Sequence, residues 1–255
     1  MLGIPIGIYL SNQWNWHIPF LAMAAFGLVG GLLVAWKMQP VNAHLGQPQE
    51  HSPWAHLYHT VTVPRHLLAF AVTALLTTGG FMLMPFSSAF IVNNLGIDMH
   101  HLPTVYLITG LCTIFAGPLI GKMADKHGKF PVFVFGTTLS IVMVVVYTRL
   151  EAIPMWALVA VNALMFVGIF ARIIPFQAMA ASVPPATQRG SFNAISASIQ
   201  QLSGGVASVV AGHIVSQAPD GKLLHFDVVG YVVVATSLVA LGLVSRLRRG
   251  MAAAV

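Results

Sequence analysis

Seven long apolar stretches follow one another along the chain, separated by short segments where polar and charged residues gather. A helix needs about 20 apolar residues to cross a bilayer, and these stretches have roughly that length. Their apolar residues are continuous rather than alternating, which favours helices over the strands of a membrane barrel. The pattern predicts helices at Ile18–Trp36, Leu67–Val92, Leu102–Ile120, Phe130–Tyr147, Ile153–Met179, Phe192–Ile214 and Phe226–Val244.

An eighth apolar stretch, Leu2–Leu10, is too short to span a bilayer. We interpret it as the end of a half helix. The predicted fold class is therefore an all-α membrane protein, a polytopic bundle of about seven complete transmembrane helices plus an N-terminal half helix. Composition agrees, because 57% of the residues are hydrophobic and 7% are charged, whereas soluble domains carry about 25% charged residues.

The positions of the basic residues along the chain indicate how the helices are oriented in the membrane. The net charge is +6, and excess Lys and Arg mark the cytoplasmic side of membrane proteins. With a cytoplasmic C-terminus, nine of the 12 basic residues fall on that side: Lys37, Arg65, Lys122, Lys126, Lys129, Arg189, Arg246, Arg248 and Arg249. The basic residues therefore indicate orientation, and we expect no nucleic-acid partner.

The spacing of the helices suggests a division into four parts. Residues 1–36 hold the half helix and one full helix, and 37–66 form a polar, proline-containing linker with an amphipathic stretch (Trp54, Leu57, Tyr58, Val61). Residues 67–247 form a six-helix bundle, and 248–255 are a cytoplasmic tail. Since only one and a half helices precede the linker, we expect further helices of a first bundle to be missing from this chain.

One loop combines glycines, an acid and basic residues at fixed spacing. It runs from Gly121 to Lys129 with the pattern G-x-x-x-D-[KR]-x-G-[KR]. Gly121 and Gly128 permit a tight reversal with close helix approach, and Asp125 can cap the next helix or pair with a basic group. With Lys126 and Lys129 the segment is a candidate gating loop; the alternative is an ordinary basic loop that only fixes orientation.

Arg172 is a charged residue inside an apolar stretch, followed by Pro175 and Gln177. A charge at membrane depth is costly and marks a functional candidate. Arg172 and Gln177 are therefore candidates for a solute cavity. The alternative is that Arg172 extends to the nearby cytoplasmic surface, since about seven residues separate it from the helix end.

Polar and small residues also mark two other helices. Gln200, Gly204, Ser208 and Gly212 recur every four residues and share one stripe, which suits either close packing or a cavity lined by Gln200 or Gln201. The helix Leu67–Val92 contains threonines and glycines that indicate either a broken helix at a binding site or a packing seam. Thr77 and Phe81 are its cavity candidates.

Other chemistry is not indicated. The 11 histidines and the single Cys112 have no zinc-site spacing, and no hydrolase, zinc-protease or phosphate-loop motif occurs. We therefore expect no metal, no cofactor and no enzymatic activity. Six acidic residues lie in predicted loops or at helix ends, so the chain offers no carboxylate proton relay in mid-membrane: Glu50, Asp98, Asp125, Glu151, Asp220 and Asp227.

These motifs together resemble the major facilitator superfamily, in its drug:proton antiporter branch. The loop Gly121–Lys129 is similar to that family's signature loop between helices 8 and 9. Gly3, Pro5 and Gly7 resemble the end of the Gly-Pro motif on helix 5, Asn12–Phe20 the turn before helix 6, and Arg189–Asn193 the start of helix 11. The resemblance covers the whole chain, from the end of helix 5 through helix 12.

The resemblance implies a secondary active transporter of the inner (plasma) membrane, with a cytoplasmic C-terminus. It implies efflux of a small solute by alternating access, with protons as the coupling ion and their carriers in the missing helices. Two alternatives stay open: a seven-helix receptor or light-driven pump, and a non-transporting membrane scaffold. The last helix carries no lysine for a retinal pigment.

Overall fold

The computed structural model describes residues 3–38, 58 and 60–252. Long helices make up nearly all of this part of the chain: α1 (Gly3–Gln13), α2 (Ile18–Lys37), α4 (Pro64–Asn93), α5 (Leu102–His127), α6 (Lys129–Thr148), α7 (Met155–Ala180), α8 (Arg189–Ile214) and α9 (Phe226–Ala252). The remaining elements are the 3-10 helices η1 (Met99–His101) and η2 (Ala186–Gln188) and the antiparallel strands β1 (Ser216–Gln217) and β2 (Leu223–Leu224).

In the described part of the chain, seven helices are long and apolar enough to cross a membrane. Each coincides with one of the seven predicted spans, and the short helix α1 falls where the half helix was expected. The prediction of an all-α, polytopic membrane protein is therefore confirmed. The amphipathic stretch predicted in the linker lies largely outside the described residues, which include only its Tyr58 and Val61, both exposed.

Two helices continue well past their predicted ends. Helix α9 was expected to stop at Val244 but continues to Ala252. Helix α5 was expected to stop at Ile120, but it continues to His127, and α6 begins at Lys129. Gly128 alone makes the reversal, with φ +92°, a conformation that glycine adopts without steric cost. The apolar stretch ends before the helix does, because a helix that leaves the bilayer needs no further apolar residues.

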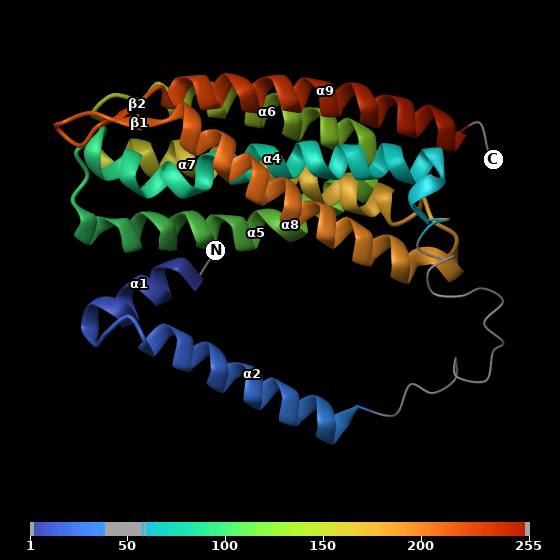
Figure 1. The fold of residues 1–255 in the computed structure, drawn as a ribbon, viewed down its shortest axis with the longest axis horizontal. Coiled ribbons are helices and arrows are strands. Elements are labelled where there is room, and N and C mark those ends of the chain that lie inside the picture. Colours follow the sequence, from blue (N-terminus) through green and yellow to red (C-terminus); the bar gives the residue numbers. More distant parts are fainter. Residues whose placement is uncertain (1–2, 39–57, 59, 253–255) are drawn as a thin grey trace.

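The helices α4–α9 form one group, seen side by side in Figure 1. Their close contacts follow the spatial order α8, α4, α9, α6, α7, α5, and the most extensive contact joins α6 and α7. The two helices at the ends of this series, α5 and α8, are not among the closely packed pairs, and neither are α4 and α7. The bundle is therefore open on the side between α5 and α8.

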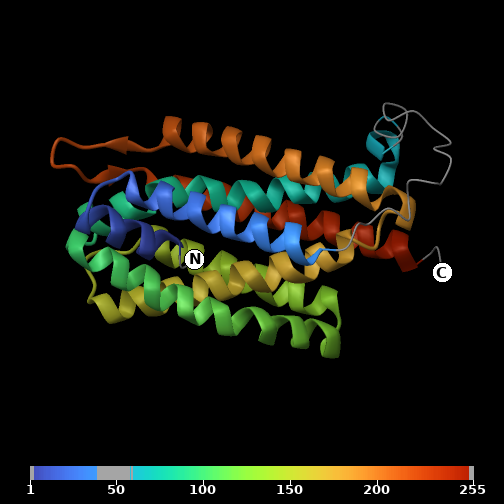
Figure 2. The same ribbon diagram turned by 90° about the horizontal axis from the view of Figure 1, so that it is seen from below.

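Alternation of the helices brings four junctions to one end of the bundle, on the right in Figures 1 and 2. This end contains the start of α4, the α5–α6 reversal, the α7–α8 connection and the end of α9. It therefore contains most of the basic residues of the bundle, and we call it the basic end.

The first two helices lie outside this group. Helix α1 contacts α5 and α2, whereas α2 has no buried residue and stands apart from α4–α9 in Figure 1. An apolar helix without buried residues is compatible with lipid as its surroundings.

Glycines set the close approach of α6 and α7. A Cβ atom added at Gly136 would lie 2.4 Å from the carbonyl carbon of Ala171, and one added at Gly168 would lie 2.8 Å from the amide nitrogen of Ser140. In lipid, helices associate through such close packing rather than through hydrophobic exclusion. This crossing also fixes the backbone at Arg172, since the Cβ atom added at Gly136 would lie 2.6 Å from the Arg172 amide nitrogen.

At the opposite end, an asparagine joins the β1–β2 hairpin to the bundle. The Asn94 side chain donates from Nδ2 to the carbonyl of Leu223 and accepts from the amide of Leu223, both at 2.9 Å. Nearby, Phe90, Tyr147 and Phe226 form an aromatic group that joins α4, α6 and α9. These contacts join the helices at the end of the bundle opposite the basic end.

Gly136→Ala is expected to destabilise the bundle, because its methyl group overlaps the α7 backbone and forces the two helices apart. Overpacking of this kind costs about 1–3 kcal/mol. Thermal unfolding in detergent measures the effect. Gly242→Ala in α9 is the control, because a Cβ atom there meets open space; equal unfolding temperatures for the two variants would contradict the assigned crossing.

Candidate functional site

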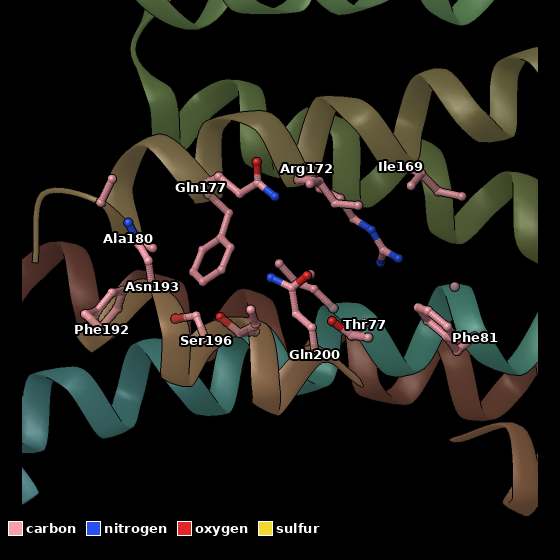
Figure 3. A pocket seen from close by; sticks show the side chains of 17 residues that line it. Thr77, Phe81, Ile169, Arg172, Gln177, Ala180, Phe192, Asn193, Ser196 and Gln200 are labelled. Carbon is pink, nitrogen blue, oxygen red and sulfur yellow. The ribbon is translucent and has the colours of Figure 1, made fainter. Parts of the chain in front are cut away.

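A cavity of about 470 Å³ lies between α4, α7 and α8. It extends from Phe81 and Ile169, near the middle of the helices, to Ala180 and Phe192 near the basic end (Figure 3). Its polar lining consists of Thr73, Thr77, Arg172, Gln177, Asn193, Ser196 and Gln200. Polar side chains at membrane depth are unsuited to lipid, so a cavity that combines them with apolar walls suits water or a ligand with polar and apolar parts.

Arg172 is the charged residue of this cavity. Its side chain is 2% exposed and is the largest fully buried side chain among the described residues. Its Nη1 donates a hydrogen bond to the Ser237 hydroxyl on α9 at 2.8 Å, and its Nε is buried without a partner. The cation thus joins α7 to α9 at the wall of the cavity.

The direction of the Arg172 side chain distinguishes the two interpretations of this residue. It extends along α7 toward Ile169, away from the end at Ala180 (Figure 3). A side chain that extended to the near surface would point toward the basic end and would be exposed. The surface interpretation therefore does not describe this structure.

Helix α4 accommodates the guanidinium through a glycine. A Cβ atom at Gly79 would lie 3.1 Å from Arg172 Nη2 and 3.2 Å from Val233 Cγ1. The helix is continuous here, and Thr73 and Thr78 bond back to Ala69 and Ala74 within it. The broken-helix alternative is therefore wrong, and this segment is both a packing seam and a cavity wall.

Five of the six predicted cavity residues line the cavity: Thr77, Phe81, Arg172, Gln177 and Gln200. They come from three helices that are distant in sequence, and Figure 3 shows them around one space. The sixth, Gln201, lies on a separate exposed surface of α8 with Leu202, Gly205 and Val206. Side chains of consecutive residues point about 100° apart around a helix, so the adjacent glutamines face different surroundings.

The polar stripe of α8 has two roles along its length. Near the basic end, Asn193, Ser196 and Gln200 line the cavity. Farther along, Gly204 packs against the Phe81 ring, which lies 2.9 Å from an added Cβ atom, and Ser208 Oγ donates to the Phe81 carbonyl at 3.2 Å. Gly212 meets open space. The same stripe therefore builds the cavity and holds α8 on α4.

Aromatic rings border the cavity at the basic end. Phe192, at the start of α8, stacks on Phe70 of α4 with ring centroids 4.8 Å apart, and His66 packs on both rings. His66 Nδ1 lies 3.0 Å from the Thr60 carbonyl. This group holds the beginnings of α4 and α8 together beside the cavity.

The candidate gating loop lies at the basic end, outside the cavity. Asp125, Lys126 and Lys129 are exposed, and Asp125 does not cap α6, which begins after Gly128 without a side-chain cap. Lys129 Nζ donates to the Ala178 carbonyl of α7 at 3.4 Å. A Cβ atom at Gly121 meets open space, so the predicted close helix approach at Gly121 is absent here, and Gly128 alone carries the reversal.

The helix-5 motif residues also lie outside the cavity. Gly3, Pro5 and Gly7 belong to α1, which contacts α5. Cβ atoms at Gly3 and Gly7 meet nothing within 4 Å. These residues are therefore not brought together with the cavity residues.

Sequence analysis did not select Ser196, Phe192 or Ser237. Ser196 was within reach, because it precedes Gln200 by four residues and so shares its helix face. Ser237 carried no such signal, since its pairing with Arg172 depends on how α7 packs on α9. In the described part of the chain, no three His, Cys, Asp or Glu side chains form a group that suits a metal ion.

Comparison with known proteins agrees with this architecture. The sequence profile of the Major Facilitator Superfamily matches residues 69–253, which is most of the chain and includes every helix around the cavity. The chain belongs to the major facilitator superfamily. The match rests on the six-helix group and gives no information on α1 or α2.

Two curated members show distant similarity. The human MFS-type transporter SLC18B1 is 28% identical over 128 residues, which are 50% of this chain and 26% of the human protein. The putative transporter AraJ of Escherichia coli (strain K12) is 23% identical over 128 residues, which are 50% of this chain and 31% of that protein. The aligned region thus covers a third or less of each relative.

Gly204→Leu is expected to push α8 away from α4, because the new side chain occupies the position of the Phe81 ring. We expect destabilisation of about 1–3 kcal/mol, measured by thermal unfolding in detergent. The neighbouring Gly205→Leu is the control, since a Cβ atom there meets open space. Destabilisation of similar size in both variants would show that α8 does not pack as described.

Proposed function

We propose that this chain forms the second helix bundle of a secondary active transporter that exports a small, amphipathic solute by alternating access. The observation that carries the proposal is the cavity between α4, α7 and α8, which contains seven polar side chains and extends toward the basic end. Membership of the superfamily supports transport over the receptor, pump and scaffold alternatives. Both relatives are also described as transporters.

We propose the division of the chain that its helices suggest. Residues 67–247 form the six-helix bundle, 37–66 link it to the helices in 1–36, and 248–255 form a tail. The bundle is open on the side between α5 and α8, and lipid is a poor neighbour for the polar side chains of the cavity. This supports a second wall made by further helices of the same transporter, such as the first bundle that the resemblance implies.

Efflux and proton coupling follow from the resemblance to the drug:proton antiporter branch. In the described part of the chain, no carboxylate lines the cavity, so we place the proton carrier in helices outside this bundle. The proposed location is the inner (plasma) membrane. The basic end of the bundle supports a cytoplasmic C-terminus.

Alternating access is tested with a single cysteine in the cavity. In the whole protein that contains this chain, Cys112→Ser removes the native thiol, and Gln200→Cys introduces a new one. A membrane-impermeant maleimide is expected to label this thiol from the cytoplasmic side, and an inhibitor or solute that favours the other state is expected to slow labelling. Leu202→Cys, on the exposed face of α8, is the control; equal labelling of both positions under all conditions would contradict the proposal.

Orientation is tested with a reporter fused after Val255. An enzyme that is active only in an oxidising exterior is expected to stay inactive there, because the C-terminus is cytoplasmic. The same reporter inserted in the β1–β2 turn, at Asp220, is expected to be active. Activity at Val255 would reverse the proposed topology and the direction in which the cavity opens.

Asp125→Asn is expected to favour the inward-open state. Asp125 is exposed and has no hydrogen bond or ion pair with the described residues, as expected where the cavity opens to the basic end. If it meets a basic group only in the closed state, its neutral variant loses that contact. Exposed pairs contribute about 0–1 kcal/mol, so the inward-open population rises by up to about fivefold.

The Gln200→Cys labelling rate from the cytoplasmic side measures this shift. Asp220→Asn is the matched control, because Asp220 is an exposed acid at the opposite end of the bundle. An unchanged rate in Asp125→Asn would leave the Gly121–Lys129 segment as a basic anchor that only fixes orientation.

A further inference from the structure

The charge at the wall of the cavity lacks an anionic partner within the described chain. The arginine side chain stays protonated in proteins, so Arg172 is a cation. A buried cation is unfavourable unless it is paired and hydrogen-bonded. Here it has one hydrogen bond, to a neutral serine, and its Nε is buried without a partner. A neutral hydroxyl does not balance the charge.

The acidic residues that the structure describes are all distant from the cavity lining. Asp98 and Asp227 are at helix starts, and Asp125, Glu151 and Asp220 are exposed at the two ends of the bundle. None of these five lines the cavity. The described residues therefore supply no counter-charge for Arg172.

The rest of the cavity is complementary to a small organic anion. Gln177, Asn193 and Gln200 bring amide donors, and Thr77 and Ser196 bring hydroxyl groups, to the space that Arg172 faces. The planar guanidinium fork matches the geometry of a carboxylate. Apolar side chains make the remaining walls, among them Leu76, Phe81, Ile169 and Phe176.

We infer that this cavity binds a small organic anion, with a carboxylate on Arg172 and an apolar body against Phe81 and Phe176. The inference rests on the proposed transport function and specifies the class of its solute. The same carboxylate chemistry has a second possible source, an acidic side chain from another part of the transporter. We assign the position to the solute because the cavity next to Arg172, with a volume of about 470 Å³, has room for a small ligand.

The test compares three probes of similar size and different charge: benzoate, benzamide and benzylamine. Binding to the whole protein in lipid nanodiscs is measured by titration calorimetry. Because a charge-assisted hydrogen bond is stronger than a neutral one, benzoate is expected to bind about tenfold or more tightly than benzamide, and benzylamine not at all. Equal binding of benzoate and benzamide, or no binding of benzoate, would overturn the inference.

Arginine variants assign the binding to one side chain. Arg172→Gln is expected to remove the preference for benzoate. Arg149→Gln is the matched control, because Arg149 bonds to Tyr231 at an exposed position outside the cavity, and it is expected to keep the wild-type affinity. An undiminished preference in Arg172→Gln would overturn the inference.

A second pair of variants leaves Arg172 in place, in case Arg172→Gln does not fold. Gln200→Glu puts a carboxylate into the cavity, so it competes with and repels benzoate, and we expect at least fivefold weaker binding. Gln201→Glu makes the same change one residue away, on the separate surface of α8, and is expected to bind benzoate like the wild type. Equal affinities in the two variants would overturn the inference.

These measurements are independent of the test of alternating access. If an acidic side chain of the transporter already pairs with Arg172, benzoate does not bind, while Gln200→Cys is still labelled in a state-dependent way. That result would overturn the anionic solute and leave the transport proposal intact. Tight benzoate binding without state-dependent labelling of Gln200→Cys would support the anionic ligand and overturn the proposal of alternating access.

Discussion

Lipid offers no hydrogen bonds to a backbone, and this constraint shapes every part of the molecule. Each amide within the bilayer must find its partner inside its own helix, so the chain crosses as unbroken helices, even where α4 carries consecutive threonines and glycines. Lipid also gives helices little reason to associate through apolar surface alone. Close contact at Gly136, Gly168 and Gly204 is therefore what holds α6 to α7 and α8 to α4.

The same constraint makes Arg172 the most unfavourable side chain in the bundle. A cation at this depth is retained only where the surrounding structure accommodates it. Gly79 leaves room for the guanidinium, Ser237 accepts one of its hydrogen bonds, and the crossing at Gly136 fixes the backbone that carries it. Three helices thus adapt to one charge, whose buried Nε has no hydrogen-bond partner among the described residues.

The cavity that we propose to bind solute and the segment that we propose as a gate lie at different positions along the bundle. The cavity residues lie on well-packed helices, which keeps their geometry fixed. The segment Gly121–Lys129 lies at the basic end, where its charged side chains are exposed and Gly128 provides the reversal. A contact there has a small free energy in either state, which suits a device that biases an equilibrium between states rather than one that locks it.

Some predictions from the sequence agree with the structure more closely than others. The spans were predictable within a few residues because length and apolar character alone decide what crosses a bilayer. The ends of α5 and α9 were not, because the length of a helix beyond the bilayer is set by local backbone geometry and not by hydrophobicity. Gly121 was expected at a helix contact, yet a spacing pattern does not reveal which face of α5 has a neighbour.

Hydrophobicity along the chain was enough to predict a polytopic helical membrane protein, the residues charged at membrane depth, and the polar residues that share a helix face. The packing of the helices was needed to show that Thr77, Gln177 and Gln200 surround the same space as Arg172, while Gln201 faces elsewhere. It also decided that Arg172 pairs with Ser237. The physical reason is that periodicity fixes the angle of a side chain around its own helix, whereas its neighbours depend on which helices pack together and at what rotation.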